Sequence, residues 1–447
     1  MTRRAERRGN GEAVAATATQ AISVVFVILL LGSYSLDRMG LGSSVPLAFP
    51  ATLFAAAFIV PVWISRRGSV PPRSQPWRYL VGLWMLFGLL LASSAWGPPG
   101  IGTSAVISEL IIMAALLTLA AFAVSLEPEA VGLRVVWLFA LVGVGYALIG
   151  LTFGGGEPGR LSVLGGGPNV FGRMLAVGLV CLLWLILAGH LPMWAGLLAP
   201  LLLAALVLSG SRGAMAAGFA GVVYLALTAR VGARRGLGTL AFIALLGVGL
   251  LAFTSAGSRV ADVVQLRVLE LTFEERYGSG REVLLAISWE IFRANPILGG
   301  GLGAFSEYIG FDTYPHNIVM SVLTAVGIVG GLLLILLLLP LVVLPFRSRR
   351  SPLVAPLLAI AMTLFVASSF SGGLYDSRFL WFALMVAATV AAPDLLGQHS
   401  PGGGYRSSKV HGEVGEWAQE VGQGFPGSRA TTLAPGGTAA APDRPPH

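Results

Sequence analysis

His316 and a group of arginines near the ends of hydrophobic segments are the residues of this chain best suited to chemistry. His316 follows Tyr314-Pro315 and stands at the start of a long apolar run. An unperturbed imidazole titrates near neutral pH, so His316 can accept or donate a proton under ordinary conditions. A histidine that only hydrogen-bonds at a membrane interface is the simpler interpretation, and the charges expected nearby favour the chemical one.

The arginines share a position near helix ends, on the side of the membrane expected for His316. They are Arg160 in a glycine-rich loop, Arg173 about one turn inside a span, Arg212 in a tight turn, Arg281 at the start of a polar segment, and Arg378. A guanidinium stays charged, and its planar fork matches phosphate oxygens. Extension of each arginine to lipid phosphates is the alternative. Together with His316 they predict an anion-binding site at the membrane surface.

The composition places most of the chain in lipid. Of 447 residues, 55% are hydrophobic and 11% are charged, whereas a soluble domain carries about 25% charged residues. The net charge of +8 does not indicate nucleic-acid binding, because the arginines are scattered between apolar runs. The single cysteine, Cys181, excludes an intrachain disulfide and a cysteine-rich metal site.

The hydrophobic segments predict an all-α, polytopic transmembrane bundle of about twelve spans. Segments of about 17–25 apolar residues can cross a bilayer as helices. The expected spans are 18–35, 45–64, 79–96, 105–125, 135–153, 169–188, 194–209, 213–229, 238–256, 316–346, 352–370 and 378–394. They form one domain, 18–397, between an N-terminal segment, 1–17, and a tail, 398–447. The tail is rich in Gly, Pro, Ser, Thr and Ala, so we expect it to be disordered.

Arginine-rich connections alternate with connections that carry little charge, and this alternation predicts the orientation. With twelve spans, the connections that hold Arg66, Arg134 and Arg347 fall on the side of the N-terminus. Arginine and lysine accumulate in cytoplasmic connections, so both termini are expected in the cytoplasm. The outer side then holds the largest loop, about 257–315.

The outer loop is expected to contain a short amphipathic helix. Ser279 and Glu282 have the spacing of a capping box, and Asn295-Pro296 ends the helix after Ala294. Its polar stripe and apolar side suit either the membrane interface or packing on the bundle, and Trp289 suits interfacial depth. A second interfacial helix is expected over 260–277. The glycines between 299 and 303 allow close approach by a ligand or by another helix.

Several short motifs, in this order, resemble the O-antigen ligase / O-antigen polymerase superfamily. They are Ser211-Arg212-Gly213-Ala214, Gly280-Arg281 with Trp289, Asn295-Pro296 with the glycines to Gly303, His316-Asn317, and Ala325-Val-Gly327 with Gly330-Gly331. Pro168-Asn169 is similar to another recurrent element of that superfamily. The resemblance covers roughly residues 155–335, and ligases, chain polymerases and protein-glycosylating members share these motifs.

The resemblance implies a glycosyltransferase related to the C-type fold, acting without a metal or a cofactor. It implies a glycan donor on undecaprenyl diphosphate at the outer face of the cytoplasmic (inner) membrane, and a glycan, lipid or protein acceptor. Arg212 and Arg281 would hold the diphosphate, and His316 would assist deprotonation of the acceptor hydroxyl. The further residues expected to contact substrate are Arg160, Arg173, Asn317 and Arg378, where Arg160 and Arg378 rest on topology alone.

Two other functions fit parts of the pattern. A transporter or flippase of lipid-linked saccharide would also carry charges and glycines within its spans. The candidate residues cluster at one end of the spans, however, which favours surface chemistry. A membrane scaffold for other assembly enzymes would depend on the tail rather than on His316.

Overall fold

The chain folds into an α-helical bundle in its first compact unit, Met1–Gln398. The computed structural model describes residues 2–31, 48–66, 76–154, 160–163, 166–228, 280–348 and 351–395, with the isolated residues 238, 247 and 265. The second unit, His399–His447, lies outside the described residues. The expected disorder of the tail therefore stays a prediction.

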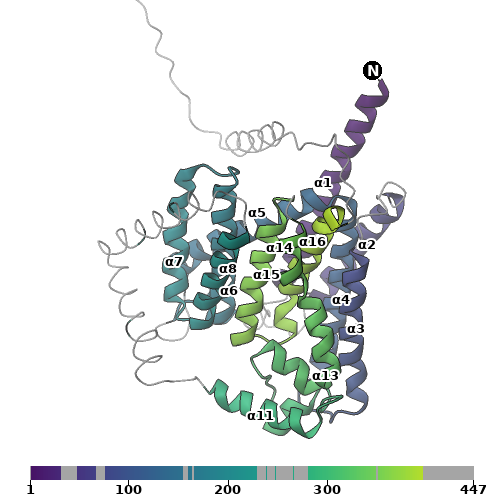
Figure 1. The fold of residues 1–447 in the computed structure, drawn as a ribbon, viewed down its shortest axis with the longest axis vertical. Coiled ribbons are helices and arrows are strands. Elements are labelled where there is room, and N and C mark those ends of the chain that lie inside the picture. The colour runs from purple at the N-terminus through teal and green to yellow at the C-terminus, as the bar shows by residue number, and fades with distance from the viewer. Residues whose placement is uncertain are drawn as a thin grey trace, which may run out of the picture. The chain divides into compact units, whose positions relative to one another are not determined.

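Helices account for the long elements of the described residues, as the sequence predicted (Figure 1). The first half holds α1 (Thr2–Leu31), α2 (Ala48–Arg66), α3 (Trp77–Ala92), α4 (Thr103–Leu126), α5 (Pro128–Phe153), α6 (Gly167–Leu187), α7 (Leu198–Leu208) and α8 (Arg212–Thr228). The second half holds α11 (Arg281–Ala294), α12 (Ala304–Ile309), α13 (Ile318–Leu338), α14 (Pro340–Arg347), α15 (Val354–Ser371) and α16 (Arg378–Leu395). Short 3-10 turns are η3 (Ser93–Ala95), η4 (Met193–Leu197) and η6 (Tyr375–Ser377).

Eight of these helical segments are long and apolar enough to cross a membrane, which makes the chain a multi-pass membrane protein. Three shorter apolar stretches, Met193–Leu208, Arg212–Thr228 and Arg378–Ala392, add to them. Every expected span coincides with a helix or with a pair of helices except 238–256, most of which lies outside the described residues. The total of twelve spans stays a prediction.

Two expected boundaries differ from the structure. The first helix begins at Thr2 rather than at residue 18, because an α-helix continues beyond the part that is apolar enough to be marked by hydropathy. The expected span 316–346 is two helices, α13 and α14, and α13 is itself broken at Val326 and Gly327.

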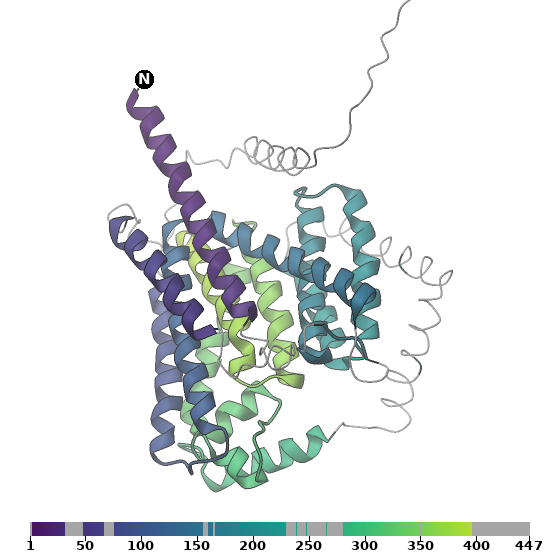
Figure 2. The ribbon, with the colours of Figure 1, turned by 180° about the vertical axis from the view of Figure 1, so that it is seen from behind.

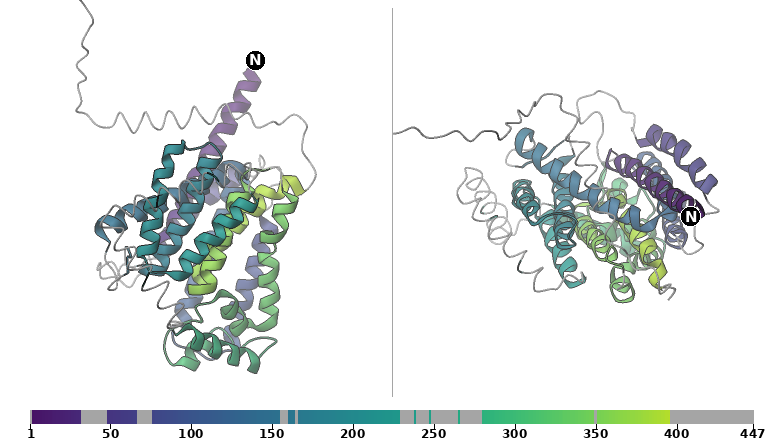
Figure 3. Two further views of the ribbon diagram at one scale, coloured as in Figure 1. Left: turned by 60° about the vertical axis from the view of Figure 1, so that its left-hand side comes forward. Right: turned by 90° about the horizontal axis from the view of Figure 1, so that it is seen from above.

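Burial separates the helices into an inner and an outer group. In helix α6, 89% of the span is buried inside the protein, whereas only 22% of the span in α2 is buried. The exposed side of α2 carries Phe49, Leu53, Phe54 and Phe58, as expected for a helix that faces lipid. Figures 2 and 3 show α1 and α2 at the periphery.

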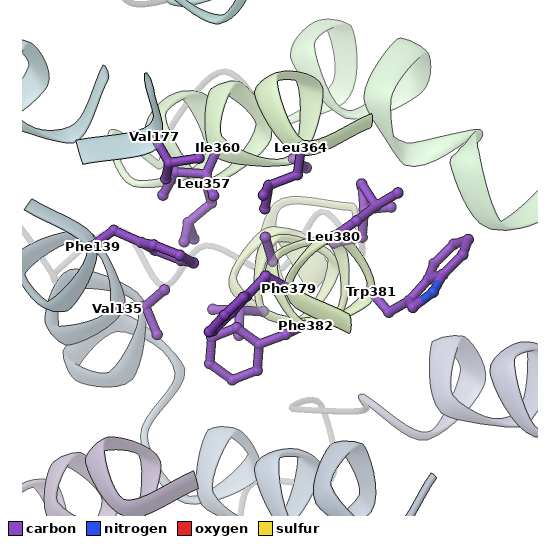
Figure 4. Close-up of a cluster of buried hydrophobic side chains, with 14 of the residues drawn as sticks. Val135, Phe139, Val177, Leu357, Ile360, Leu364, Phe379, Leu380, Trp381 and Phe382 are labelled. Carbon is purple, nitrogen blue, oxygen red and sulfur yellow. The ribbon is translucent and has the colours of Figure 1, made fainter. Parts of the chain in front are cut away.

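The core surrounds the first half of α16 (Figure 4). Phe379 lies 5.3 Å from Phe139 of α5, measured between ring centroids, and Phe139 lies 4.8 Å from Phe26 of α1. Trp381 and Phe382 are fully buried. This packing fixes the start of α16, and with it the position of Arg378, the first residue of the helix.

Candidate functional site

A break in α13 supports the glycine-rich segment that follows α11. Within α13, Val326 and Gly327 have non-helical backbone angles, and Gly327 has φ 60° and ψ −155°. The break exposes backbone groups that a continuous helix would pair. Gly300 N donates to Thr324 O at 2.8 Å, Gly301 N donates to Ala325 O at 3.0 Å, and Ile328 N donates to Pro296 O at 2.9 Å. Residues 296–301 therefore pair with the backbone N–H and C=O groups that the break in α13 leaves without helical partners.

The same glycine-rich segment contacts the turn that follows α3, at η3 and Gly97. A Cβ on Gly301 would collide with the backbone of Gly97, which requires glycine for this close approach. The sequence left open whether a ligand or another helix approaches these glycines. In the structure the partners of Gly300 and Gly301 are protein backbone, so these glycines join α3, α11 and α13 at one end of the bundle.

Helix α11 is the amphipathic helix predicted for the outer loop, and it packs on the bundle. Its apolar side, Leu284, Ile287 and Ile291, contacts Ala304 and Phe305 of α12. Its polar stripe, Glu282, Ala286, Glu290 and Arg293, is exposed, and so is Trp289. Ser279, the expected cap, lies outside the described residues, and Gly280 occupies the cap position with φ 72°. The expected helix over 260–277 also lies outside them.

His316 lies immediately before α13 in a left-handed backbone conformation, with φ 54°. It is the one non-glycine residue with positive φ in the described part of the chain. Left-handed geometry is uncommon for side chains other than Asn, Asp and His, and such outliers concentrate at functional sites. The Tyr314 ring lies 4.3 Å from the His316 ring, measured between centroids.

Asn317, expected to contact substrate, is the N-cap of α13. Its Oδ1 accepts hydrogen bonds from Val319 N and Met320 N, both at 3.0 Å, and its Nδ2 donates to Ser369 O at 2.9 Å. The apolar run predicted a start at residue 316, whereas the helix begins at Ile318, so the capping role of Asn317 was not expected. The side chain fixes the start of α13 against α15, while its predicted contact with substrate stays a prediction.

Three arginines from separate elements form an arginine cluster, defined as Arg160, Arg212 and Arg281. Partial burial lowers the pKa of the Arg281 guanidinium, and the nearby positive charges of Arg212 and Arg160 lower it further. Arg212 begins α8 after the turn at Gly210, and Arg281 begins α11. Like charges held together in a half-buried site create a place where an anion is stabilised.

Asn169 connects the segment of Arg160 to the turn that precedes Arg212. Its Oδ1 accepts from Ser211 Oγ at 2.9 Å and from Arg160 Nη2 at 3.4 Å, and Arg160 Nε donates to Ser209 O at 3.3 Å. Asn169 lies in the first turn of α6. The turn before Arg212 and the segment of Arg160 are thus fastened to the same helix end. This contact gives a physical reason for the Pro168-Asn169 motif.

Arg173 and Arg378, the buried arginines, lie deeper than the arginine cluster. Arg173 is 5% exposed, and its Nη1 and Nη2 donate to the carbonyl oxygens of Asp376 at 2.8 Å and Ser371 at 3.1 Å. A charge inside a membrane span is expected to have a partner, and these two carbonyls are partners of Arg173. Arg378 is 4% exposed and interacts electrostatically with Glu109 and Arg173. Substrate contact by either arginine stays a prediction.

The electrostatic surroundings of His316 favour its neutral form. Partial burial lowers the pKa of His316 below its ordinary value of 6.5, and the positive charge of Arg281 lowers it further, while Asp376 acts in the opposite direction. A neutral imidazole has a free nitrogen lone pair, so His316 is ready to accept a proton at neutral pH.

Sequence reasoning gave no role to three residues around this site. Asp376 and Tyr314 hydrogen-bond to each other, with Tyr314 Oη donating to Asp376 Oδ2 at 2.8 Å. Glu109 of α4 interacts electrostatically with Arg378 and Asp376. Glu109 carried a usable signal, since an ionisable residue within an apolar segment is a functional candidate in itself. Asp376 carried a weaker one, because it lies in the same short connection as Arg378.

The comparisons with known proteins agree with the motifs. A family model described as O-antigen ligase matches residues 197–335. The matched region includes Arg212, Arg281, His316 and Asn317, and leaves out Arg160, Arg173 and Arg378. A comparison with curated proteins found no match. The match supports membership of the O-antigen ligase superfamily for this multi-pass membrane protein, and with it a membrane ligase- or polymerase-like role.

Proposed function

We propose that the protein transfers a glycan from an undecaprenyl-diphosphate carrier to an acceptor hydroxyl at the outer face of the cytoplasmic membrane, in cell-surface polysaccharide assembly. The observation that carries the proposal is the convergence of Arg212, Arg281 and Arg160, with His316 in electrostatic range of Arg281. The family match supports the general activity, and the division of roles among these residues is part of the proposal.

The proposed reaction exchanges one glycosidic bond for another. The acceptor hydroxyl oxygen attacks the anomeric carbon of the donor, and the bond from that carbon to the diphosphate oxygen breaks. The hydroxyl proton passes to the neutral imidazole of His316, and the carrier leaves as undecaprenyl diphosphate. Positive charge that is already in place where negative charge develops lowers the barrier without further reorganisation, which is the role of Arg212 and Arg281.

The proposed orientation rests on the ends of the helices. Asn317 at the start of α13 contacts Ser369 near the end of α15, and Arg173 near the start of α6 contacts Asp376 in the connection that follows α15. These ends therefore share one side of the bundle. Arg347 is the last residue of α14, at the opposite end of the α13–α14 pair from Asn317. By the positive-inside tendency of the connections, we propose that the end with Arg347 is cytoplasmic and that the His316 end is at the outer face.

Replacing His316 tests the mechanism. His316→Asn removes the imidazole and keeps a residue type that tolerates positive φ. We expect glycan transfer from a lipid-linked donor, measured in membranes as new glycosidic product, to fall about 10²-fold to 10⁴-fold, the usual contribution of a general base. Near-normal turnover of His316→Asn, at matched protein levels, would contradict the proposal.

The control is Arg293→Ala. Arg293 is exposed on α11 at the end opposite Arg281, so its removal changes the net charge of the same helix without touching the arginine cluster. Product analysis also separates transfer from transport: a transporter would move the lipid-linked saccharide across the membrane without forming a new glycosidic bond.

A further inference from the structure

We infer that Asp376 and Tyr314 are a positioning pair, which holds the imidazole of His316 in the orientation needed to take the proton of the acceptor hydroxyl. This inference rests on the proposed function, since it gives the pair a purpose in that reaction. Neither residue was assigned a role from the sequence, and Asp376 lies outside the region matched by the family model.

The pair is built by direct contacts. Tyr314 Oη donates to Asp376 Oδ2 at 2.8 Å, and Gly373 N approaches the same oxygen at 3.4 Å. The Tyr314 ring lies beside the His316 ring at 4.3 Å with an interplanar angle of 45°. The hydroxyl end of Tyr314 is therefore fixed by Asp376, and the ring confines one side of the imidazole.

The backbone of His316 requires such support. Its φ of 54° costs free energy for a residue with a side chain and persists only where neighbours hold it. Tyr314 is held on one side by Asp376, and Asn317 is held on the other by Ser369 O at 2.9 Å. Pro315, between them, is buried. His316 thus stands between two fixed residues.

Asp376 is itself anchored from the interior. The buried Arg173 donates to Asp376 O at 2.8 Å and to Ser371 O at 3.1 Å, so one guanidinium holds both ends of the connection between α15 and α16. Ser377 Oγ donates to Gly373 O at 2.8 Å within that connection. The chain of contacts runs from Arg173 through Asp376 and Tyr314 to His316.

The carboxylate also balances the charges around the imidazole. Arg281 lies in electrostatic range of His316, and Arg212 and Arg160 lie in electrostatic range of Arg281. Asp376 and Arg281 shift the pKa of His316 in opposite directions. Asp376 also interacts electrostatically with Arg173 and with Glu109. Asp376 raises the pKa of His316, so removing its charge must lower that pKa, and the imidazole must then titrate at lower pH.

The first test measures the imidazole without the reaction. Carbethoxylation of His316 in the full chain, followed by mass spectrometry of the His316 peptide as a function of pH, reports its titration midpoint. We expect Asp376→Asn to move the midpoint to lower pH. Tyr314→Phe, which keeps the Asp376 charge and the ring, is expected to move it less. Asp312→Asn, an exposed carboxylate near Glu109, is the matched control and is expected to leave the midpoint in place.

The second test measures transfer. Asp376→Asn keeps the backbone carbonyl that Arg173 binds, so we expect it to fold with a near-normal unfolding temperature. Its kcat is expected to fall about 10-fold to 100-fold, the loss that accompanies a misplaced reacting group, and the acid limb of kcat/KM should move to lower pH with the midpoint. Asp376→Glu should recover part of the loss.

The outcomes separate the two hypotheses. An unchanged midpoint in folded Asp376→Asn overturns the positioning pair, whatever happens to transfer. A shifted midpoint in a chain whose wild type forms no glycosidic product overturns the proposed function, while the contact of the pair with His316 stands. A shifted midpoint with a shifted acid limb supports both.

Discussion

The arginine cluster and the buried arginines use the same side chain in opposite ways. Arg212 and Arg281 are half-buried at the starts of two helices, close enough for like charges to act on each other. Arg173 is 5% exposed and bonds to two backbone carbonyls, and Arg378 is 4% exposed and interacts with Glu109. The first group gathers positive charge in partly exposed positions. In the second group, backbone carbonyls accept hydrogen bonds from Arg173, and the carboxylate of Glu109 interacts with Arg378.

This difference teaches how to separate binding arginines from structural ones in a membrane protein. A guanidinium whose donors are taken by backbone carbonyls stabilises the fold. Mutual repulsion between half-exposed guanidinium groups costs stability, and an anion such as a diphosphate relieves it. The proposed function therefore assigns diphosphate binding to the arginine cluster, and the inferred positioning pair links His316 to Arg173 through the connection that Arg173 binds.

The largest expected effect comes from the cluster. Arg281→Ala or Arg212→Ala should reduce kcat for glycan transfer about 10²-fold to 10³-fold, the usual loss when one donor to a developing anion is removed. Lysine at either position should recover only part of the activity, since an ammonium lacks the planar fork. Turnover numbers with a lipid-linked donor check this, and full activity of the lysine variants would mean that charge alone is used.

The next effect concerns stability and distinguishes the two groups directly. Arg173→Met leaves the carbonyls of Ser371 and Asp376 without their donor, so the free energy of unfolding should fall by about 1–3 kcal/mol for each carbonyl. Arg281→Met should not lower it, because it removes a charge from a repelling group. Thermal unfolding in detergent compares the two variants. Equal destabilisation by both would contradict the comparison.

A smaller effect is expected at Asn317. Because its side chain caps α13, Asn317→Ala should lower the free energy of unfolding by about 1 kcal/mol. Asn317→Asp keeps an acceptor for Val319 N and Met320 N and loses the donor to Ser369 O, so it should lie between alanine and wild type. If Asn317→Ala raises the KM for donor without changing the unfolding temperature, the residue binds substrate rather than capping the helix.

The smallest effect is expected at the edge of the cluster. Arg160 donates through long hydrogen bonds of 3.3 and 3.4 Å to Ser209 O and Asn169 Oδ1, so part of its capacity is already used. Arg160→Ala should raise the KM for donor by about threefold to tenfold, corresponding to one hydrogen bond of modest net strength, with little change in kcat. A loss of kcat as large as that of Arg281→Ala would place Arg160 at the reacting diphosphate.

The sequence predicted what depends on local pattern. Helix α11 ends where Asn295-Pro296 requires, and the apolar runs coincide with helices. The break in α13 could not be predicted, because the hydropathy of 318–338 is continuous and the break exists only with residues 296–301 as hydrogen-bond partners. Asp376 was missed for the same reason: its importance comes from contacts with Tyr314 and Arg173, which are distant in the chain. The convergence of arginines could be expected from topology, and their different roles could not.

The buried first half of α16 has a consequence for the membrane as an electrical barrier. From Phe379 to Ala387 every side chain is apolar and at most 4% exposed, a stretch of about 14 Å, close to half the thickness of the hydrocarbon core. A cell that stores energy as an ion gradient requires that ions do not leak through the membrane beside a polar site. Because this stretch presents no charged side chain and is closely packed, it offers ions no path along α16 from the end where Arg378 and Asp376 lie.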